Sequence, residues 1–160
     1  GYGTRLRQIE RPVAVIDVAR GEEFTAVAGG GAFLDGNAIR VSGQDDLVKS
    51  LIVTGFPYDR RENADRYTRV LKRVLSNIQG IRRTGSAALD MCYVACGRFD
   101  GYWEYGLGAW DAAASLIVVT EAGGTWTGFE GRPYRLGSGG VVVTNGLIHS
   151  ALTSAVGDGT

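Results

Sequence analysis

Residues 98–124 read RFDGYWEYGLGAWDAAASLIVVTEAGG, and this stretch decides the fold. Its first part, Phe99 to Tyr105, is rich in aromatic side chains and predicts a β-strand. Apolar and small residues then run from Trp110 to Ala122, and Gly123-Gly124 follows at the place where a left-handed residue commonly ends a helix. The stretch therefore predicts a strand, a glycine-punctuated connection and a helix in direct succession.

Asp111 is the acid at the front edge of this predicted helix. Its carboxylate would lie near the positive end of the helix dipole, which keeps it ionised and allows it to hold a cation. Asp is also among the preferred residues at helix N-caps, so the position by itself favours a cap. Two interpretations therefore stand for Asp111, a capping residue or a ligand at the mouth of a strand-to-helix junction.

Composition predicts one soluble domain. The chain has 160 residues, 44% of them hydrophobic, and no apolar run approaches the ~20 residues of a membrane span. Lys plus Arg and Asp plus Glu both number 17, so charge predicts neither nucleic acid nor an anionic membrane as a partner. Cys92 and Cys96 lie four residues apart in a helical pattern, which argues against a disulfide framework and fits a cytoplasmic setting. Zinc would need more His or Cys ligands than the single His149 adds, so zinc is not favoured.

The N-terminal part of the chain has a β pattern. Residues 1–10 contain neither an initiator methionine nor the apolar segment of a signal peptide, which predicts a fragment or a processed chain. Residues 12–28 and 32–41 each predict a β-hairpin, the second one around the favoured turn Asp35-Gly36. The three glycines at 29–31 are assigned to a bulge or flexible corner, because no helix with a P-loop lysine follows to make them a phosphate cradle.

After a polar linker from Gly43 to Lys49, strands and helices alternate, which indicates a layered α/β architecture. Asp59 followed by Glu62 resembles a capping box, and a long amphipathic helix is predicted from Ala64 to Ile78. Its polar face is interpreted as a solvated surface, with a binding patch as the alternative. The basic residues on that face are Arg61, Arg66, Arg69, Lys72 and Arg73. Further strands are predicted at 50–54, 81–84, 125–127 and 141–144, and a short terminal helix from residue 147.

The helix that begins after Gly85-Ser86 is dominated by small residues, so it should be buried in the middle of the layers. Ser86 is a natural N-cap, and the amides of the first turn would face whatever lies in front of the helix. An oxygen-rich ligand could bind there, although a capped and empty helix end is the commoner case.

Together these motifs resemble the C-terminal half of the inositol monophosphatase family, over a stretch from about Arg11 to about Ser150. The segments that carry the resemblance are Trp110-Asp111-Ala112-Ala113-Ala114 through Glu121-Ala122-Gly123-Gly124, together with Arg83-Thr84-Gly85-Ser86-Ala87-Ala88 and Gly101-Tyr102-Trp103-Glu104. The resemblance implies a layered αβαβα sandwich of the sugar phosphatase type with its N-terminal portion truncated. Residues 1–42 would be a remnant hairpin part of the N-terminal subdomain, and residues 43–160 the C-terminal α/β subdomain.

The resemblance also implies a function, that of a Mg²⁺-dependent phosphomonoester hydrolase. Asp111 would be catalytic, ligate the Mg²⁺ ion and meet a substrate hydroxyl, while Glu104 would hydrogen-bond the polyol. Gly85, Ser86 and Ala87 would present a helix N-terminus to the substrate, which would be inositol 1-phosphate or a similar small polyol phosphate. The implied assembly is a cytoplasmic homodimer. The motifs do not separate inositol phosphatases from relatives that act on histidinol phosphate or nucleotide bisphosphates.

One departure from the family limits this prediction. Family members carry a D-P-x-D-G-T metal motif and an earlier metal-binding Glu upstream of the hairpin, where this chain has Gly1 to Glu10. Phosphate monoester hydrolysis commonly uses two ions roughly 4 Å apart and several carboxylates, so Asp111 alone is half a site at best. This chain is therefore expected to have little phosphatase activity, and a non-catalytic fragment or interaction subunit is the alternative. A glycosidase-like acid/base pair of Glu104 and Asp111 is a further, less favoured alternative.

Two geometric expectations follow. Glu104, Asp111 and the amides around Ser86 should open on one pocket, because each follows or ends a strand at a strand-to-helix junction. The β run of residues 12–28 should pair with strands that the chain does not contain, so its edge should be exposed and the isolated chain should associate.

Overall fold

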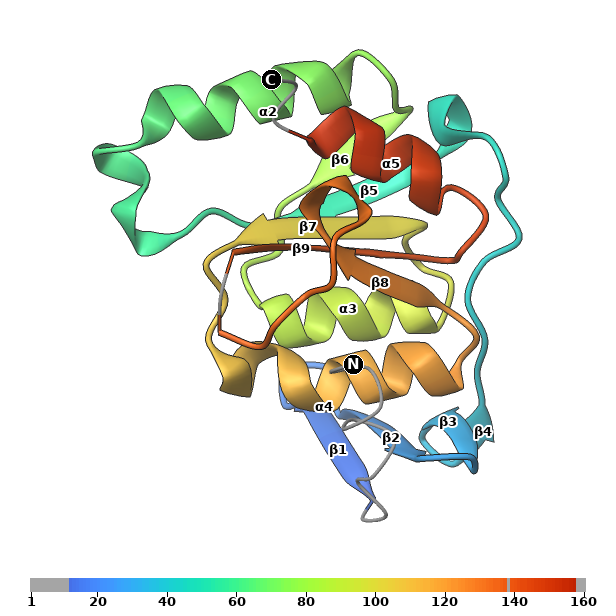
Figure 1. Cartoon of the computed structure of the whole chain (residues 1–160). Helices are drawn as coiled ribbons and strands as arrows, with labels where there is room; N and C mark the ends of the chain where they lie inside the picture. Colours follow the sequence, from blue (N-terminus) through green and yellow to red (C-terminus); the bar gives the residue numbers. More distant parts are fainter. Residues whose placement is uncertain (1–11, 138, 158–160) are drawn as a thin grey trace.

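The structure, a computed structural model, describes residues 12–137 and 139–157. They stack as four layers, namely an antiparallel sheet, a pair of helices, a mixed sheet and a second pair of helices (Figure 1). This order confirms the layered α/β class. The described residues form four layers, in the order β, α, β and α, of the five in the predicted αβαβα sandwich.

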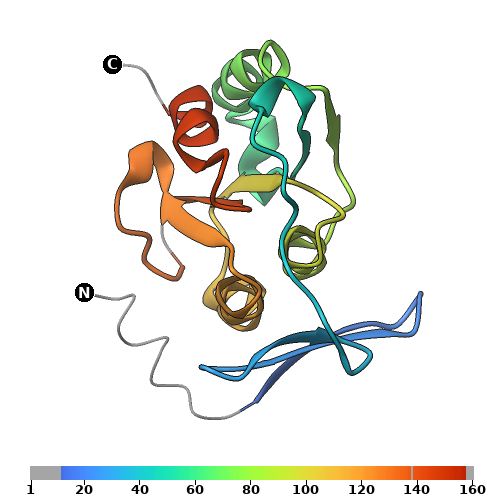
Figure 2. The same ribbon diagram turned by 90° about the vertical axis from the view of Figure 1, so that its right-hand side faces the viewer.

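The antiparallel sheet has the strand order β1-β2-β3-β4. Its strands are β1 (Val13–Asp17), β2 (Glu22–Val27), β3 (Gly31–Leu34) and β4 (Asn37–Ala38). Both predicted hairpins are therefore confirmed. Figure 2 shows this sheet running beneath two helices that are seen along their axes, so the sheet packs against the sides of α3 and α4. Among the described residues β1 is an edge strand, as expected, and Ile16 on it is 59% exposed.

The mixed sheet has the strand order β6-β5-β7-β9-β8. Its strands are β5 (Leu51–Thr54), β6 (Gly80–Arg82), β7 (Gly101–Tyr105), β8 (Thr125–Gly128) and β9 (Gly140–Thr144). Strands β6, β5 and β7 run parallel to one another, and β9 is antiparallel to both β7 and β8. The parallel strands end at the same edge of the sheet, where α/β proteins commonly place ligands.

Two helix layers cover the mixed sheet. Helices α3 (Ala87–Ala95) and α4 (Ala109–Glu121) lie between the two sheets, and α2 (Ala64–Leu75) and α5 (His149–Val156) pack on the opposite face (Figure 1). Short 3-10 turns connect some of these elements, at η1 (Leu47–Lys49), η2 (Tyr58–Arg61) and η3 (Phe129–Gly131). Most of α3 is buried, as its small residues predicted. Among the described helices, none combines the length and apolar character needed to cross a membrane.

Strand β7 separates two apolar cores. Tyr102 belongs to the core that contains α3 and α4, whereas Trp103 and Tyr105 belong to the core under α2 and α5. This division follows from the alternation of side chains along a strand. The same alternation places Glu104 on the Tyr102 side, at the carboxyl end of the strand.

The predicted capping box at the start of α2 is wrong. Asp59 lies in η2, a turn before the helix, and its carboxylate accepts hydrogen bonds from the Tyr67 hydroxyl at 2.7 Å and from Asn63 Nδ2 at 2.9 Å. The chain tightens into a 3-10 turn before α2, so Asp59 cannot reach the first helical amides. The helix also ends at Leu75, earlier than the predicted Ile78.

The basic face of α2 is only partly a solvated surface. Arg73 donates hydrogen bonds to the carbonyls of Ala155, Val156 and Gly157 at the C-terminal end of α5. The Arg66 guanidinium lies 4.6 Å from the centre of the Tyr105 ring. The interpretation as a solvated face is therefore wrong for Arg73, which is half-buried against α5, whereas Arg66 remains exposed while it stacks on Tyr105.

The three consecutive glycines form a turn with a specific partner. The backbone amides of Gly29 and Gly31 donate to the Glu121 carboxylate at 2.9 and 3.0 Å, and both glycines have positive φ angles, of 75° and 89°. The chain reverses direction here between β2 and β3, which agrees with the predicted corner. The anion that these amides bind is a side chain from the end of α4, which joins the antiparallel sheet to the helix layer.

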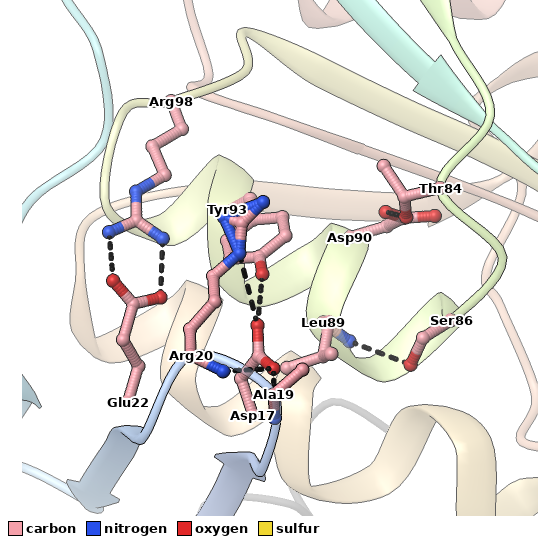
Figure 3. Close-up of polar contacts among 10 residues, drawn as sticks. All are labelled: Asp17, Ala19, Arg20, Glu22, Thr84, Ser86, Leu89, Asp90, Tyr93 and Arg98. Carbon is pink, nitrogen blue, oxygen red and sulfur yellow. Dashed lines mark hydrogen bonds and ion pairs between the residues drawn. The ribbon is translucent and has the colours of Figure 1, made fainter.

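A second polar link joins the antiparallel sheet to α3 (Figure 3). Arg98 makes two hydrogen bonds to the Glu22 carboxylate, at 2.6 and 2.7 Å, and the Tyr93 hydroxyl donates to Asp17 at 2.6 Å. These contacts and the Glu121 contact tie the antiparallel sheet to the C-terminal ends of α3 and α4.

Candidate functional site

A cavity of about 210 Å³ opens at the carboxyl ends of β5 and β7 and at the starts of α3 and α4. Its lining contains all five residues singled out from the sequence, which are Gly85, Ser86, Ala87, Glu104 and Asp111. The expected convergence on one pocket therefore agrees with the structure. The roles of these residues remain predictions, since a shared cavity does not establish what each one does.

Asp111 both caps α4 and lines the cavity. Its Oδ2 atom accepts a hydrogen bond from the Gly108 backbone amide at 3.0 Å, in the first turn of the helix. Asp111 is not the N-cap itself, as its residue type suggested: Gly108 is the N-cap, and Asp111, three residues later, accepts the hydrogen bond of the Gly108 amide with one carboxylate oxygen, which leaves the second oxygen for other contacts. The two interpretations of Asp111 are compatible, because one half-buried carboxylate serves the helix with one oxygen and the cavity with the other.

Glu104 is held in the cavity wall by its own strand. The Tyr102 hydroxyl donates to Glu104 Oε2 at 2.5 Å. Burial raises the pKa of Glu104, and the Tyr102 hydrogen bond and the positive charge of Arg83 oppose that rise. A Cβ atom on Gly55 would lie 2.1 Å from Glu104 Oε2, so only glycine at position 55 lets the carboxylate occupy this place.

Asp90 is a buried acid in the same cavity that the sequence analysis did not single out. Its carboxylate, 1% exposed, accepts a short hydrogen bond from the Thr84 hydroxyl (Figure 3). Burial raises the pKa of Asp90 to about 6, which the Thr84 hydrogen bond partly offsets. One feature of the sequence could have indicated this buried acid: Asp90 is the only charged residue in a helix of apolar and small residues.

The start of α3 faces the cavity. Ser86 is the N-cap, as predicted, and its hydroxyl accepts a long hydrogen bond of 3.5 Å from the Leu89 amide (Figure 3). Gly85 has a φ angle of 104°, a backbone conformation that glycine adopts readily and that would be strained for other residues. First-turn amides have no partner within a helix, so Ser86 and Ala87 bring backbone donors to the lining.

Arg83 brings the positive charge of this cavity closest to its acids. It lines the cavity, and its charge lowers the pKa of both Asp90 and Glu104. Arg83 belongs to the segment Arg83-Thr84-Gly85, and no pattern near it in the sequence indicates which acids it faces.

The described residues supply only part of a metal site. Asp111 has the oxygen chemistry that Mg²⁺ prefers. Over residues 12–137 and 139–157, however, no cluster of three or more His, Cys, Asp and Glu side chains could hold a metal ion. The other acids in the cavity are occupied, Glu104 by Tyr102 and Asp90 by Thr84. Asp111 therefore fits as one ligand of a Mg²⁺ ion and does not complete a site.

Comparison with known proteins identifies close relatives. The model of the inositol monophosphatase family matches residues 10–159. The inositol-1-monophosphatase of Synechocystis sp. is 42% identical over 154 residues, which cover 96% of this chain and 54% of that protein. The Nus factor SuhB of Pseudomonas aeruginosa is 42% identical over 144 residues, covering 89% of this chain and 53% of that protein.

Solved structures give the same result. The inositol monophosphatase from Anabaena (Nostoc) sp. matches with a TM-score of 0.85 and 44% identity, over 89% of this chain and 57% of that one. The chain thus spans about half the length of the curated relatives that it matches.

Proposed function

This chain belongs to the inositol monophosphatase family, and from this premise we propose that it carries one half of a Mg²⁺-dependent phosphomonoesterase site. The proposed substrate is inositol 1-phosphate or a similar small polyol phosphate, the compound class in the names of its relatives. One observation carries the proposal: a single cavity gathers the Asp111 carboxylate, the Glu104 carboxylate and the first turn of α3.

Each group has a distinct task in this proposal. Glu104, held by Tyr102, accepts a hydrogen bond from a hydroxyl of the polyol and so orients it. The amides at the start of α3 donate to substrate oxygens, with the helix dipole in their favour. Asp111 would offer the carboxylate oxygen that does not cap α4 to the ion, and would accept a hydrogen bond from a substrate hydroxyl. When bound, Mg²⁺ supplies charge neutralisation and an activated water.

The described residues alone bring too few acids together for this reaction, so we expect little turnover by the 160-residue chain. A longer protein with an upstream D-P-x-D-G-T segment should be active and Mg²⁺-dependent. The assay is release of inorganic phosphate from inositol 1-phosphate, with and without Mg²⁺, by both proteins. Robust turnover by the shorter chain would contradict the ligand count.

Variants of the longer protein separate the two acids. Asp111→Asn removes a charged ligand and should cost about 3 kcal/mol of transition-state stabilisation, on the order of a hundredfold in rate. Glu104→Gln keeps the shape and should raise KM more than it lowers kcat, because it contacts the polyol. Asp65→Asn, on the exposed face of α2, is the matched control. An Asp111→Asn protein with an unchanged rate would leave Asp111 as a helix cap only.

A further inference from the structure

Asp90 is a buried acid of the candidate site that has no task in the proposed function. It lies in the first part of α3, and its backbone amide donates a hydrogen bond to the carbonyl of the N-cap Ser86 at 2.8 Å. It lines the cavity that Glu104 and Asp111 also line, yet it is only 1% exposed. Acidic side chains are almost never fully buried unless they are paired, so the contacts of the Asp90 carboxylate indicate its role.

The Asp90 carboxylate reaches back across the start of α3. It accepts a hydrogen bond from the hydroxyl of Thr84, six residues earlier in the chain (Figure 3). Thr84 precedes Gly85 and the N-cap Ser86, so it lies outside the helix that contains Asp90. The hydrogen bond therefore ties the turn that enters α3 to the body of the helix. With a pKa of about 6, Asp90 is mostly ionised at pH 7, and hydrogen bonds to a charged acceptor are about twice as strong as neutral ones.

The other features of this turn restrain it weakly. The Ser86 hydroxyl accepts from the Leu89 amide at 3.5 Å, which is at the outer limit for a hydrogen bond. Gly85, in the middle of the turn, is a residue type with wide backbone freedom. The contact between Thr84 and Asp90 is therefore a stronger restraint on the turn than the Ser86 cap.

The same turn carries the positive charge of the cavity. A Cβ atom on Gly85 would lie 2.8 Å from Arg83 Nη1, so the guanidinium lies directly against the turn. The charge of Arg83 lowers the pKa of both Asp90 and Glu104, and Glu104 and Tyr102 on β7 are the other titratable groups that interact with Asp90. A displacement of the turn would therefore move the first-turn amides of α3 and also the guanidinium beside them.

We propose that Asp90 is a positioning residue of this site, which acts through Thr84 to hold the amides of Ser86 and Ala87 toward the substrate. Asp90 acts on the turn and not on the substrate itself. The inference rests on the proposed function, in which these amides donate to substrate oxygens. It assigns the buried acid a task in substrate binding, in addition to its effect on the stability of α3.

Kinetics of the longer protein with inositol 1-phosphate and Mg²⁺ test this role. Thr84→Val removes the hydroxyl and Asp90→Leu removes the acceptor. Each should lower kcat/KM roughly tenfold or more, mainly through KM, because substrate oxygens lose well-placed amide donors before and during the reaction. Thr84→Ser and Asp90→Asn keep a donor and an acceptor, so they should restore KM. Thr68→Val is the matched control, because the Thr68 hydroxyl bonds to the Ala64 carbonyl on the exposed face of α2.

Two further measurements separate positioning from a general loss of stability. In the 160-residue chain without ligand, the ¹⁵N order parameters of Gly85 to Ala87 should fall from about 0.85 toward about 0.6 in Thr84→Val and Asp90→Leu, and the control variant should leave them unchanged. In the longer protein, the Thr84→Val, Asp90→Leu double variant should have the KM of either single variant, because both changes break the same hydrogen bond. Thr84 is exposed, so Thr84→Val should fold even if Asp90→Leu does not.

The outcomes separate the two proposals. A longer protein that does not hydrolyse inositol 1-phosphate with Mg²⁺ would overturn the proposed function and this inference with it. Normal turnover with an unchanged KM in Thr84→Val would overturn the inference alone, whatever the variant does to stability in urea. Order parameters that stay near 0.85 in Thr84→Val, or losses that add in the double variant, would show that Asp90 does not act through Thr84 and would also overturn it.

Discussion

Replacing Asp90 with asparagine should change how the stability of this protein depends on pH. Asp90 lies on α3 with only 1% of its surface exposed, and its carboxylate accepts a hydrogen bond from Thr84. Burial raises its pKa from the ordinary 3.8 to about 6. Between these two values the folded chain holds a proton that the unfolded chain has released.

The sign and size of the effect follow from proton linkage. Because the native state binds more protons between pH 3.8 and about 6, the stability contributed by Asp90 is complete below pH 3.8 and is lost as the pH rises to about 6. A change of pKa from 3.8 to about 6 corresponds to about 3 kcal/mol. Asparagine is neutral throughout, and its carbonyl oxygen can still accept the Thr84 hydrogen bond.

Urea denaturation of the wild type and Asp90→Asn at pH 4, 5, 6 and 7 measures this difference. The free energy of unfolding of the variant, relative to wild type, should increase by about 2 kcal/mol from pH 4 to pH 7, since the rest of the change lies below pH 4. Asp65→Asn, which removes one carboxylate from the exposed face of α2, controls for net charge. Parallel pH profiles for Asp90→Asn and wild type would refute the assignment of a buried, proton-holding Asp90.

Three other predictions concern packing and assembly. Gly55→Ala should weaken inositol 1-phosphate binding at least tenfold in calorimetry, because the new Cβ would lie 2.1 Å from Glu104 Oε2 and force the carboxylate to move. Gly43→Ala is the control and should leave binding unchanged, because the space around a Cβ at position 43 is open. Glu121→Gln should lower the free energy of unfolding by about 1–2 kcal/mol, since a charged acceptor of two backbone amides becomes neutral; an unchanged urea midpoint would contradict this. At roughly tens of micromolar the chain should associate through its exposed edge sheet, and Ile16→Lys should reduce the light-scattering mass, whereas a monomeric wild type would argue against the association.

Local sequence patterns were sufficient for much of the fold. The stretch from Arg98 to Gly124 forms β7 and α4 as predicted, and Gly123 ends the helix with a φ angle of 87°. The Ser86 cap and the Asp35-Gly36 hairpin turn are likewise correct. These features depend on residues close in sequence, whose conformational preferences remain the same whatever packs around them. The failure at Asp59 shows the limit, because the 3-10 turn there makes room for the Tyr67 hydroxyl eight residues later.

The candidate site depends both on local sequence patterns and on tertiary contacts. Side-chain alternation along β7 and the Asp at the start of α4 were readable from the sequence, so Glu104 and Asp111 could be predicted. The partners that decide their chemistry come from other parts of the chain: Gly55, directly after β5, leaves space for Glu104, and Arg83 follows β6. Such contacts join strands that are far apart in the chain, and no local pattern encodes them.

What only the tertiary structure decided is the environment of the charged groups. In the sequence, Asp90 is an ordinary acid within a helix. In the structure, α3 is buried between two sheets, and the loss of water around the carboxylate raises the pKa of Asp90. The amides of Gly29 and Gly31 find the Glu121 carboxylate about ninety residues away in the chain. Arg66 meets Tyr105 only when α2 packs on the mixed sheet. Desolvation and long-range pairing depend on what surrounds a group in space, whereas the sequence determines only its neighbours along the chain.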